Sequence, residues 1–367
     1  MPSSGSTRHS RASPIRSSPT AATFWTAASA RPQGRHNRAR SVRDKPNLGA
    51  VNSRARISMT TKVSLATLAQ VSLTATVPHY NLARLKTGIM HFGVGNFHRA
   101  HQATYLDDLF NLGEGHDWAI AGAGVRAADG HMRLLLERQD WLSTIVEEDG
   151  HRTTTRVLAP MAEFLEPGET DAILDRLEDP AIRIVSLTIT PGGYYVDPTT
   201  GHFDADHPDV VADAEDINAP RTVIGLIVAA LRRRWNSGAG AFTVLSCDDM
   251  PENGRVAASA VLDLAAMVEP ELAGWVRANA TFPNSIARRT VRAASDEDRH
   301  LLERSFGIEA VSPVFAGPDR EWIIEDNFAA GRPALEKVGV RFVDDINALE
   351  GSSDVGDVES ETPEHAH

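Results

Sequence analysis

Short apolar runs alternate with helical patterns through the middle of this chain. Four of these runs indicate strands buried in a sheet, at residues 89–94, 118–125, 182–189 and 242–246. Apolar residues recur with the spacing of amphipathic helices over residues 97–112, 170–177, 221–235, 253–267 and 271–280. This alternation predicts an α/β fold with a mostly parallel sheet and helices on both of its faces.

Turn signals divide the patterned segments. Residues 142–147 and 153–158 are both extended in character and flank a Glu-Asp-Gly turn signal, so they predict a pair of strands. The run at 182–189 stops at the Pro-Gly-Gly sequence of residues 191–193, which neither a helix nor a strand would continue.

The first apolar run breaks at Gly93 and Gly95 and passes directly into the first helical pattern. Glycine lets a backbone approach phosphates closely, and a helix N-terminus offers free N–H donors. This arrangement is typical of the pyrophosphate turn of a Rossmann-like, doubly wound fold, and Asn96, which directly follows Gly95, is a further expected contact of the dinucleotide. The third glycine of the usual fingerprint is absent, and His98 stands in its place.

Polar or glycine-rich residues follow each of the predicted strands. Asp129 follows the second strand, residues 188–193 the third and residues 248–251 the fourth, so all are expected at one edge of the sheet. Asp129 is predicted to bind the adenosine ribose, although it lies 34 residues after Gly95 rather than about 20. A carboxylate there favours NAD, but the neighbouring Arg126 leaves NADP open.

Composition narrows the class of protein. The 367 residues are 42% hydrophobic and 23% charged, as is ordinary for a globular chain. Residues 1–58 carry a net charge of +10, so the rest carries −22 of the total of −12, which argues against nucleic-acid binding. No apolar run approaches the roughly 20 residues of a membrane-spanning helix. With Cys247 as the only cysteine, no intramolecular disulfide can form, and we expect a cytoplasmic protein.

The two ends differ from the middle. Residues 1–58 are rich in Ser, Arg, Ala and Pro and are predicted to be disordered. Two alternatives are an organellar targeting segment and a translation start at Met59. The predicted organisation continues with a lead-in segment (59–87), an NAD(P)-binding domain (88–349) and a disordered acidic tail (350–367).

No metal site is expected. His98 and His101 are three residues apart, but no cysteine or carboxylate recurs near them at the spacing of a ligand set. Cys247 is interpreted as a buried strand-end residue rather than a nucleophile.

Residues 91–102 (HFGVGNFHRAHQ) resemble the opening of the mannitol dehydrogenase family, the long-chain polyol-specific dehydrogenases. Further segments resemble that family in the same order, at residues 186–194, 246–254, 282–284, 322–328 and 331–339. The resemblance implies a Rossmann domain, NAD(P)-dependent oxidation of a polyol to a ketose without a metal, and a large helical C-terminal domain. It also implies that Gly93, Gly95 and Phe97 line the pyrophosphate turn and that Asp129 holds the ribose.

The chain departs from this family at positions of catalysis. The resemblance implies a lysine base in a K-x4-N-x2-H motif just beyond residues 344–347, but no lysine follows Lys337. Asp249 stands at the position of an oxyanion-binding asparagine, and an ionised carboxylate cannot donate a hydrogen bond. Pro191 replaces a glutamate and Arg288 an acid. The catalytic residues therefore remain unassigned.

Three hypotheses follow. The first is a diverged or truncated polyol dehydrogenase that binds NAD but turns over little as a single chain. The second is an active enzyme completed by a separately encoded C-terminal half, and the third is a non-catalytic nucleotide-binding or interaction protein. Mannitol, arabinitol, fructuronate and tagaturonate all remain open as the polyol or sugar acid. Absence of the helical domain predicts an exposed apolar face, and hence self-association.

Overall fold

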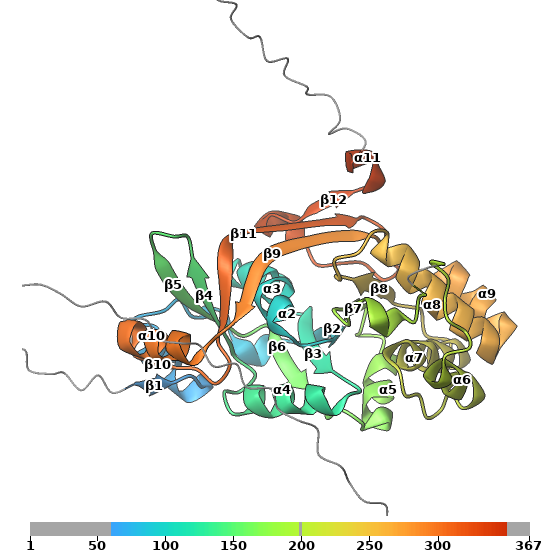
Figure 1. Cartoon of the computed structure of the whole chain (residues 1–367), viewed down its shortest axis with the longest axis horizontal. Coiled ribbons are helices and arrows are strands. Elements are labelled where there is room, and N and C mark those ends of the chain that lie inside the picture. The colour runs from blue at the N-terminus through green and yellow to red at the C-terminus, as the bar shows by residue number, and fades with distance from the viewer. Residues whose placement is uncertain (1–59, 198–199, 351–367) are drawn as a thin grey trace, which may run out of the picture. The chain divides into compact units, whose positions relative to one another are not determined.

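The computed structural model describes residues 60–197 and 200–350, and its centre is a five-stranded parallel sheet in the order β6–β3–β2–β7–β8 (Figure 1). The strands are β2 (Thr87–Phe92), β3 (Ala119–Ala123), β6 (Met161–Phe164), β7 (Ile184–Leu187) and β8 (Thr243–Ser246). The chain builds outward from β2 through β3 and β6, and then crosses to β7 and β8 on the other side. The order of strands therefore reverses between β2 and β7, where a ligand crevice is expected.

Helices cover both faces of this sheet, as the sequence predicts. Alternate residues of β2 point to opposite faces, so Met90 packs in one core cluster and Ile89 in another. Helices that contribute to the Met90 side are α5 (Thr170–Glu178), α6 (Pro208–Glu215), α7 (Val223–Ser237), α8 (Asn253–Val268) and α9 (Pro270–Asn279). The Ile89 side is covered by α2 (Asn96–Ala100), α3 (Gln102–Asn111) and α4 (Ala127–Glu137).

A second, mixed sheet lies against α2 and α3 and was not predicted (Figure 1). It contains β4 (Ser143–Glu148), β5 (Thr153–Leu158), β9 (Ser285–Ala293), β11 (Val314–Glu325) and β12 (Arg341–Val343). The predicted pair of strands is confirmed as the antiparallel β4–β5 hairpin. The long β9–β11 pair escaped prediction because exposed charged residues interrupt its apolar alternation. The prediction of one mostly parallel sheet for residues 88–349 is therefore incomplete, because this part of the chain also contains the mixed sheet.

Smaller elements complete the described chain. Strand β1 (Thr61–Lys62) pairs in parallel with β10 (Ile308–Glu309). The remaining helical segments are η1 (Leu65–Thr67), α1 (Leu68–Val71), η2 (Leu82–Arg84), η3 (Pro191–Tyr194), α10 (Asp296–Phe306), η4 (Leu335–Val338) and α11 (Asn347–Glu350). Within residues 60–197 and 200–350, no helix is long and apolar enough to cross a membrane. The disorder predicted for residues 1–58 and 350–367 concerns segments outside the described residues, except for Glu350, which is the last residue of α11.

The single helix predicted over residues 97–112 is wrong in one respect. The chain breaks at His101, where φ is −112° and ψ is −87°, so α2 has only five residues before α3 begins. The cause lies in tertiary contacts, because the His101 ring bonds to the carbonyl oxygen of Glu321 on β11 at 2.9 Å.

Candidate cofactor and substrate site

The carboxyl ends of β2, β7 and β8 open onto two adjoining cavities. The larger, of about 750 Å³, is lined by Gly93, Gly95, Asn96 and Phe97 together with residues that follow β7 and β8. The smaller, of about 420 Å³, is lined by Gly93 and Asp129. Gly93 and Thr190 contribute to both cavities, so the two adjoin at the switch point, and together they are called the crevice. The structure thus brings together the strand-end residues that the sequence singled out.

The two glycines of the turn have different roles. Gly93 has a φ of +96°, and a Cβ there would lie 2.1 Å from the carbonyl oxygen of Thr188, so the fold itself requires glycine. A Cβ on Gly95 would meet no protein atom closer than 3.7 Å. Gly95 is therefore not needed for packing and leaves open space against the backbone, as a bound phosphate group would require.

Asn96 presents its amide to the larger cavity in a defined orientation. Its Oδ1 accepts a hydrogen bond from Arg99 Nη2 at 2.7 Å. Arginine has only donors, so this contact fixes which atom is the oxygen and leaves the Nδ2 hydrogens for another acceptor. Phe97 is half-buried and stacks on His101, with ring centroids 4.9 Å apart.

Two buried histidines lie beneath the turn. The rings of His91 and His98 stack with centroids 3.5 Å apart. His91 bonds to Ser186 Oγ at 2.8 Å, and burial lowers its pKa to about 3. Burial also lowers the pKa of His98. Both rings are therefore neutral at physiological pH, and the described residues contain no cluster of His, Cys, Asp or Glu able to hold a metal.

Asp129 lies in the third position of α4 at the rim of the smaller cavity. Its Oδ2 accepts hydrogen bonds from the backbone N–H groups of Val125 (3.1 Å) and Arg126 (3.0 Å). A Cβ on Gly124 would lie 2.4 Å from the Cβ of Asp129, so this close approach needs glycine, which sequence reasoning missed. Asp129 thus stabilises the start of α4 with one oxygen, and its contact with a ribose stays a prediction.

Asp248 is the main site residue that the sequence did not single out individually. Its carboxylate accepts backbone hydrogen bonds from Ile189 and Thr190, both at 3.0 Å, and one from the Tyr194 hydroxyl at 2.8 Å. Burial raises the pKa of Asp248, while these hydrogen bonds oppose that rise. Asp248 therefore joins the end of β8 to the loop after β7.

Two of the residues that depart from the family pattern, Asp249 and Arg288, line the larger cavity, whereas Pro191 lines neither cavity. Asp249 is exposed, and Arg288 on β9 contacts Glu321 at 3.3 Å. Pro191 begins η3 beside them, and Cys247 is buried, which raises the pKa of its thiol. The three lysines that the structure describes are Lys62, Lys86 and Lys337, and none of them lines either cavity.

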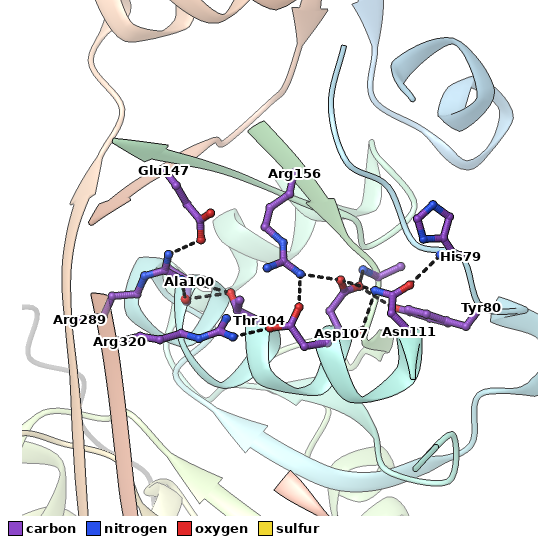
Figure 2. Close-up of polar contacts among 12 residues, drawn as sticks. His79, Tyr80, Ala100, Thr104, Asp107, Asn111, Glu147, Arg156, Arg289 and Arg320 are labelled. Carbon is purple, nitrogen blue, oxygen red and sulfur yellow. Dashed lines mark hydrogen bonds and ion pairs between the residues drawn. The ribbon is translucent and has the colours of Figure 1, made fainter. Parts of the chain in front are cut away.

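A network of ion pairs fixes the second sheet against α2 and α3 (Figure 2). Arg289 on β9 pairs with Glu147 on β4, and Arg320 on β11 pairs with Asp108 on α3. Arg156 on β5 lies 3.1 Å from Asp107 and 2.6 Å from Asp108, while Asp107 also accepts a bond from Tyr80. This network determines where β9 presents Arg288 to the cavity.

Large apolar side chains that are exposed lie on separate elements among the described residues. They are Leu65, Leu73, Leu112, Leu134 and Met267. None of them lines the two cavities. These residues do not form the apolar face expected on the ligand side of the sheet, and self-association stays a prediction.

Comparison with known proteins identifies the group to which this architecture belongs. A family model for the mannitol dehydrogenase Rossmann domain matches residues 87–337. The mannitol 2-dehydrogenase of Cereibacter sphaeroides is 53% identical over 279 residues, which are 75% of this chain and 57% of that protein. The polyol:NADP oxidoreductase of Gluconobacter oxydans is 42% identical over 292 residues, covering 78% and 60%.

A solved structure agrees with these sequence relatives. The Pseudomonas fluorescens mannitol 2-dehydrogenase, in a ternary complex with NAD and D-mannitol, superposes with a TM-score of 0.77 at 43% identity. The match covers 79% of this chain and 59% of that one. The chain therefore spans 57–60% of the length of these relatives. Sequence, fold and site together show that this chain belongs to the mannitol dehydrogenase family.

Proposed function

We propose that this protein is a polyol dehydrogenase of the mannitol dehydrogenase type that binds NAD in the crevice at the Gly93 turn. The observation that carries the proposal is the open space at Gly95 in the larger cavity, two residues after Gly93, which lines both cavities at the switch point of the parallel sheet. A relative with the same fold was solved with NAD and D-mannitol. Bound NAD would supply the acceptor for a hydride from the alcohol carbon.

Different residues of the crevice suit different parts of the cofactor. The Gly93–Gly95 backbone and the free Nδ2 hydrogens of Asn96 suit the pyrophosphate, because both offer space or donors to phosphate oxygens. Asp129 lies at the rim of the other cavity, where its second oxygen is 3.6 Å from Arg126. A carboxylate there suits ribose hydroxyls and repels the 2′-phosphate of NADP, so NAD is the proposed cofactor and NADP the alternative.

We infer that turnover is impaired in this chain. Oxidation of an alcohol transfers a hydride to the cofactor and a proton to a base, and the oxygen that carries the developing charge needs hydrogen-bond donors. Asp249 brings a carboxylate to the position where the family resemblance implies an asparagine donor. Its negative charge would oppose an alkoxide rather than stabilise it.

The test combines binding with turnover. Calorimetry should show NAD binding to the full chain, and D-mannitol-dependent NADH formation should fall far below that of the Pseudomonas fluorescens enzyme assayed in parallel. Failure to bind either NAD or NADP would overturn the cofactor assignment. Turnover equal to that of the control would refute the impairment.

A matched double variant tests the cause of the impairment. Asp249→Asn with Arg288→Asp restores the side-chain types that the family resemblance implies at two exposed positions. Because Arg288→Asp places a second carboxylate opposite Glu321, a thermal melt of the double variant should accompany the assay. We expect NADH formation to rise by about a hundredfold, the lower end of the effect of one oxyanion donor. No gain would show that these two positions do not limit turnover. Complete inactivity of the double variant with NAD bound would favour the non-catalytic nucleotide-binding alternative.

A further inference from the structure

Arg99 is a fully buried cation directly beneath the cofactor turn. Its side chain is 0% exposed, and burial lowers its pKa to about 10, so it stays protonated at neutral pH. Within the described residues, no carboxylate lies within 4.0 Å of its guanidinium, and its hydrogen bonds go to neutral acceptors. Burying a charge without a countercharge is costly, so a structural role alone leaves this arrangement unexplained.

Three other buried or partly buried arginines are compensated. The Arg289 side chain is equally inaccessible but pairs with Glu147. Arg156, which is partly exposed, pairs with Asp107. Arg234 bonds to four carbonyl oxygens near the C-terminus of α5, where Asp179 and Glu178 also act on its pKa. Burial alone shifts the pKa of Arg99. Arg99 therefore differs from all three.

The contacts of Arg99 concentrate on the cofactor turn. Its Nε donates to the carbonyl oxygen of Gly95 at 3.3 Å, and Nη2 donates to Asn96 Oδ1 at 2.7 Å. From the other side, Nη1 and Nη2 donate to the backbone oxygen (2.6 Å) and hydroxyl (3.1 Å) of Ser312. The guanidinium thus contacts Gly95, the residue that borders the open space, and its neighbour Asn96.

The rest of the crevice offers little positive charge. Carboxylates that line the two cavities include Asp129, Asp248, Asp249, Asp319 and Glu321. Of the arginines that line them, Arg126, Arg288, Arg289 and Arg320 are each paired with an acid. The exposed Arg221 of the smaller cavity has no ion pair among the described residues, but it does not line the larger cavity, which contains Gly95. Helix α2 has five residues, so it aligns fewer peptide dipoles than the long helix that the sequence predicts.

We propose that Arg99 is a positioning residue that supplies the buried countercharge for the pyrophosphate of the dinucleotide. This inference rests on the proposed function, because it assumes that the turn binds the dianionic pyrophosphate of a cofactor. Arg99 acts through Gly95 and Asn96, whose geometry it fixes, and through its charge. A bound pyrophosphate provides the negative partner that the free protein lacks.

The first experiment separates charge from structure. In Arg99→Gln, which keeps a donor but loses the charge, NAD affinity measured by calorimetry should fall by about tenfold or more, as expected for one lost charge pair at short range. Adenosine, which lacks the pyrophosphate, should bind within about twofold of wild type by ligand-observed NMR. The matched control is Arg234→Gln, a buried arginine remote from the turn, in which NAD affinity should be unchanged.

The second experiment uses pH and remains informative if Arg99→Gln does not fold. A buried lysine has a lowered pKa, so in Arg99→Lys the affinity for NAD should fall as pH rises through that pKa, with proton uptake on binding seen by calorimetry in two buffers. The wild type should bind NAD with constant affinity from about pH 7 to pH 9, below the pKa of Arg99.

Two results would overturn the inference. One is equal weakening of NAD and adenosine in Arg99→Gln, which indicates a structural role. The other is NAD affinity in Arg99→Lys that does not change with pH. If the wild type itself binds neither NAD nor NADP, the proposed function fails first, and this outcome is distinguishable because it does not depend on any Arg99 variant.

Discussion

The carboxylate of Asp248 accepts a hydrogen bond from the backbone N–H of Thr190 at 3.0 Å, and Thr190 has a φ of +67°. Residues other than glycine rarely adopt this left-handed backbone conformation, which costs on the order of 1–3 kcal/mol. Asp248 therefore holds strained backbone at the point where the two cavities meet.

Replacing Asp248 should release this loop. In Asp248→Ala, two backbone N–H groups and the Tyr194 hydroxyl lose an acceptor, and we expect the free energy of unfolding to fall by about 2–4 kcal/mol. Urea unfolding followed by circular dichroism would measure it. Thr190→Gly in the same background should recover part of the loss, and Asp249→Ala, which removes an exposed neighbour, should change stability by less than about 0.5 kcal/mol. Equal effects of the two alanine substitutions would contradict this role of Asp248.

The two glycines of the turn predict opposite phenotypes. Gly93→Ala should destabilise the fold by about 3 kcal/mol or more, because its Cβ collides with the Thr188 carbonyl oxygen at a positive φ. Gly95→Ala should leave the melting temperature unchanged and yet weaken NAD binding by at least about tenfold, because its Cβ enters the space proposed for the pyrophosphate. Thermal melts and calorimetry on the same preparations would compare them. Full NAD affinity in Gly95→Ala would exclude this turn as the phosphate site.

Asp129 combines a structural contact with a proposed choice of cofactor. Asp129→Asn keeps an oxygen for the N–H groups of Val125 and Arg126 and removes the negative charge. We expect little change in stability, and a fall of about tenfold in the preference for NAD over NADP, an estimate for one charge interaction near the surface. Arg126→Gln should shift the preference the opposite way. Affinities for both cofactors, measured at one ionic strength, would test this, and an unchanged ratio in both variants would place the 2′-position elsewhere.

The parallel sheet and the turn could be predicted from sequence, because each buried strand is a continuous apolar run and Gly93 and Gly95 directly follow the first of these runs. The β9–β11 pair could not be predicted from contiguous patterns, because its charged residues are explained by partners on other elements, such as Glu147 for the buried Arg289. Arg99 was equally inaccessible to sequence reasoning. Its role depends on Ser312, which is 213 residues away along the chain. The sequence shows two consecutive aspartates, Asp248 and Asp249, after β8, but it does not reveal that Asp248 accepts hydrogen bonds from the backbone after β7.

Acid sensitivity should originate partly at His101, the residue at which α2 ends. Burial lowers its pKa to about 4, whereas a histidine in the unfolded chain has a pKa near 6.5. Below about pH 6.5 the unfolded chain takes up a proton that the folded chain refuses, so stability falls as pH decreases from about 6.5 to 4, by about 3 kcal/mol in total from this residue. His101→Gln keeps a donor for the Glu321 carbonyl oxygen but does not titrate. It should lower stability at pH 7.5, where the ring contacts are lost, and reduce the slope of unfolding free energy against pH by up to one proton. Urea titrations between pH 7.5 and pH 4.5 would measure that slope.

Because His91 is also buried with a lowered pKa, some dependence of the unfolding free energy on pH should persist in His101→Gln. A slope identical to that of the wild type would mean that His101 is protonated in the folded protein, and its contact with Glu321 would then have to be reconsidered.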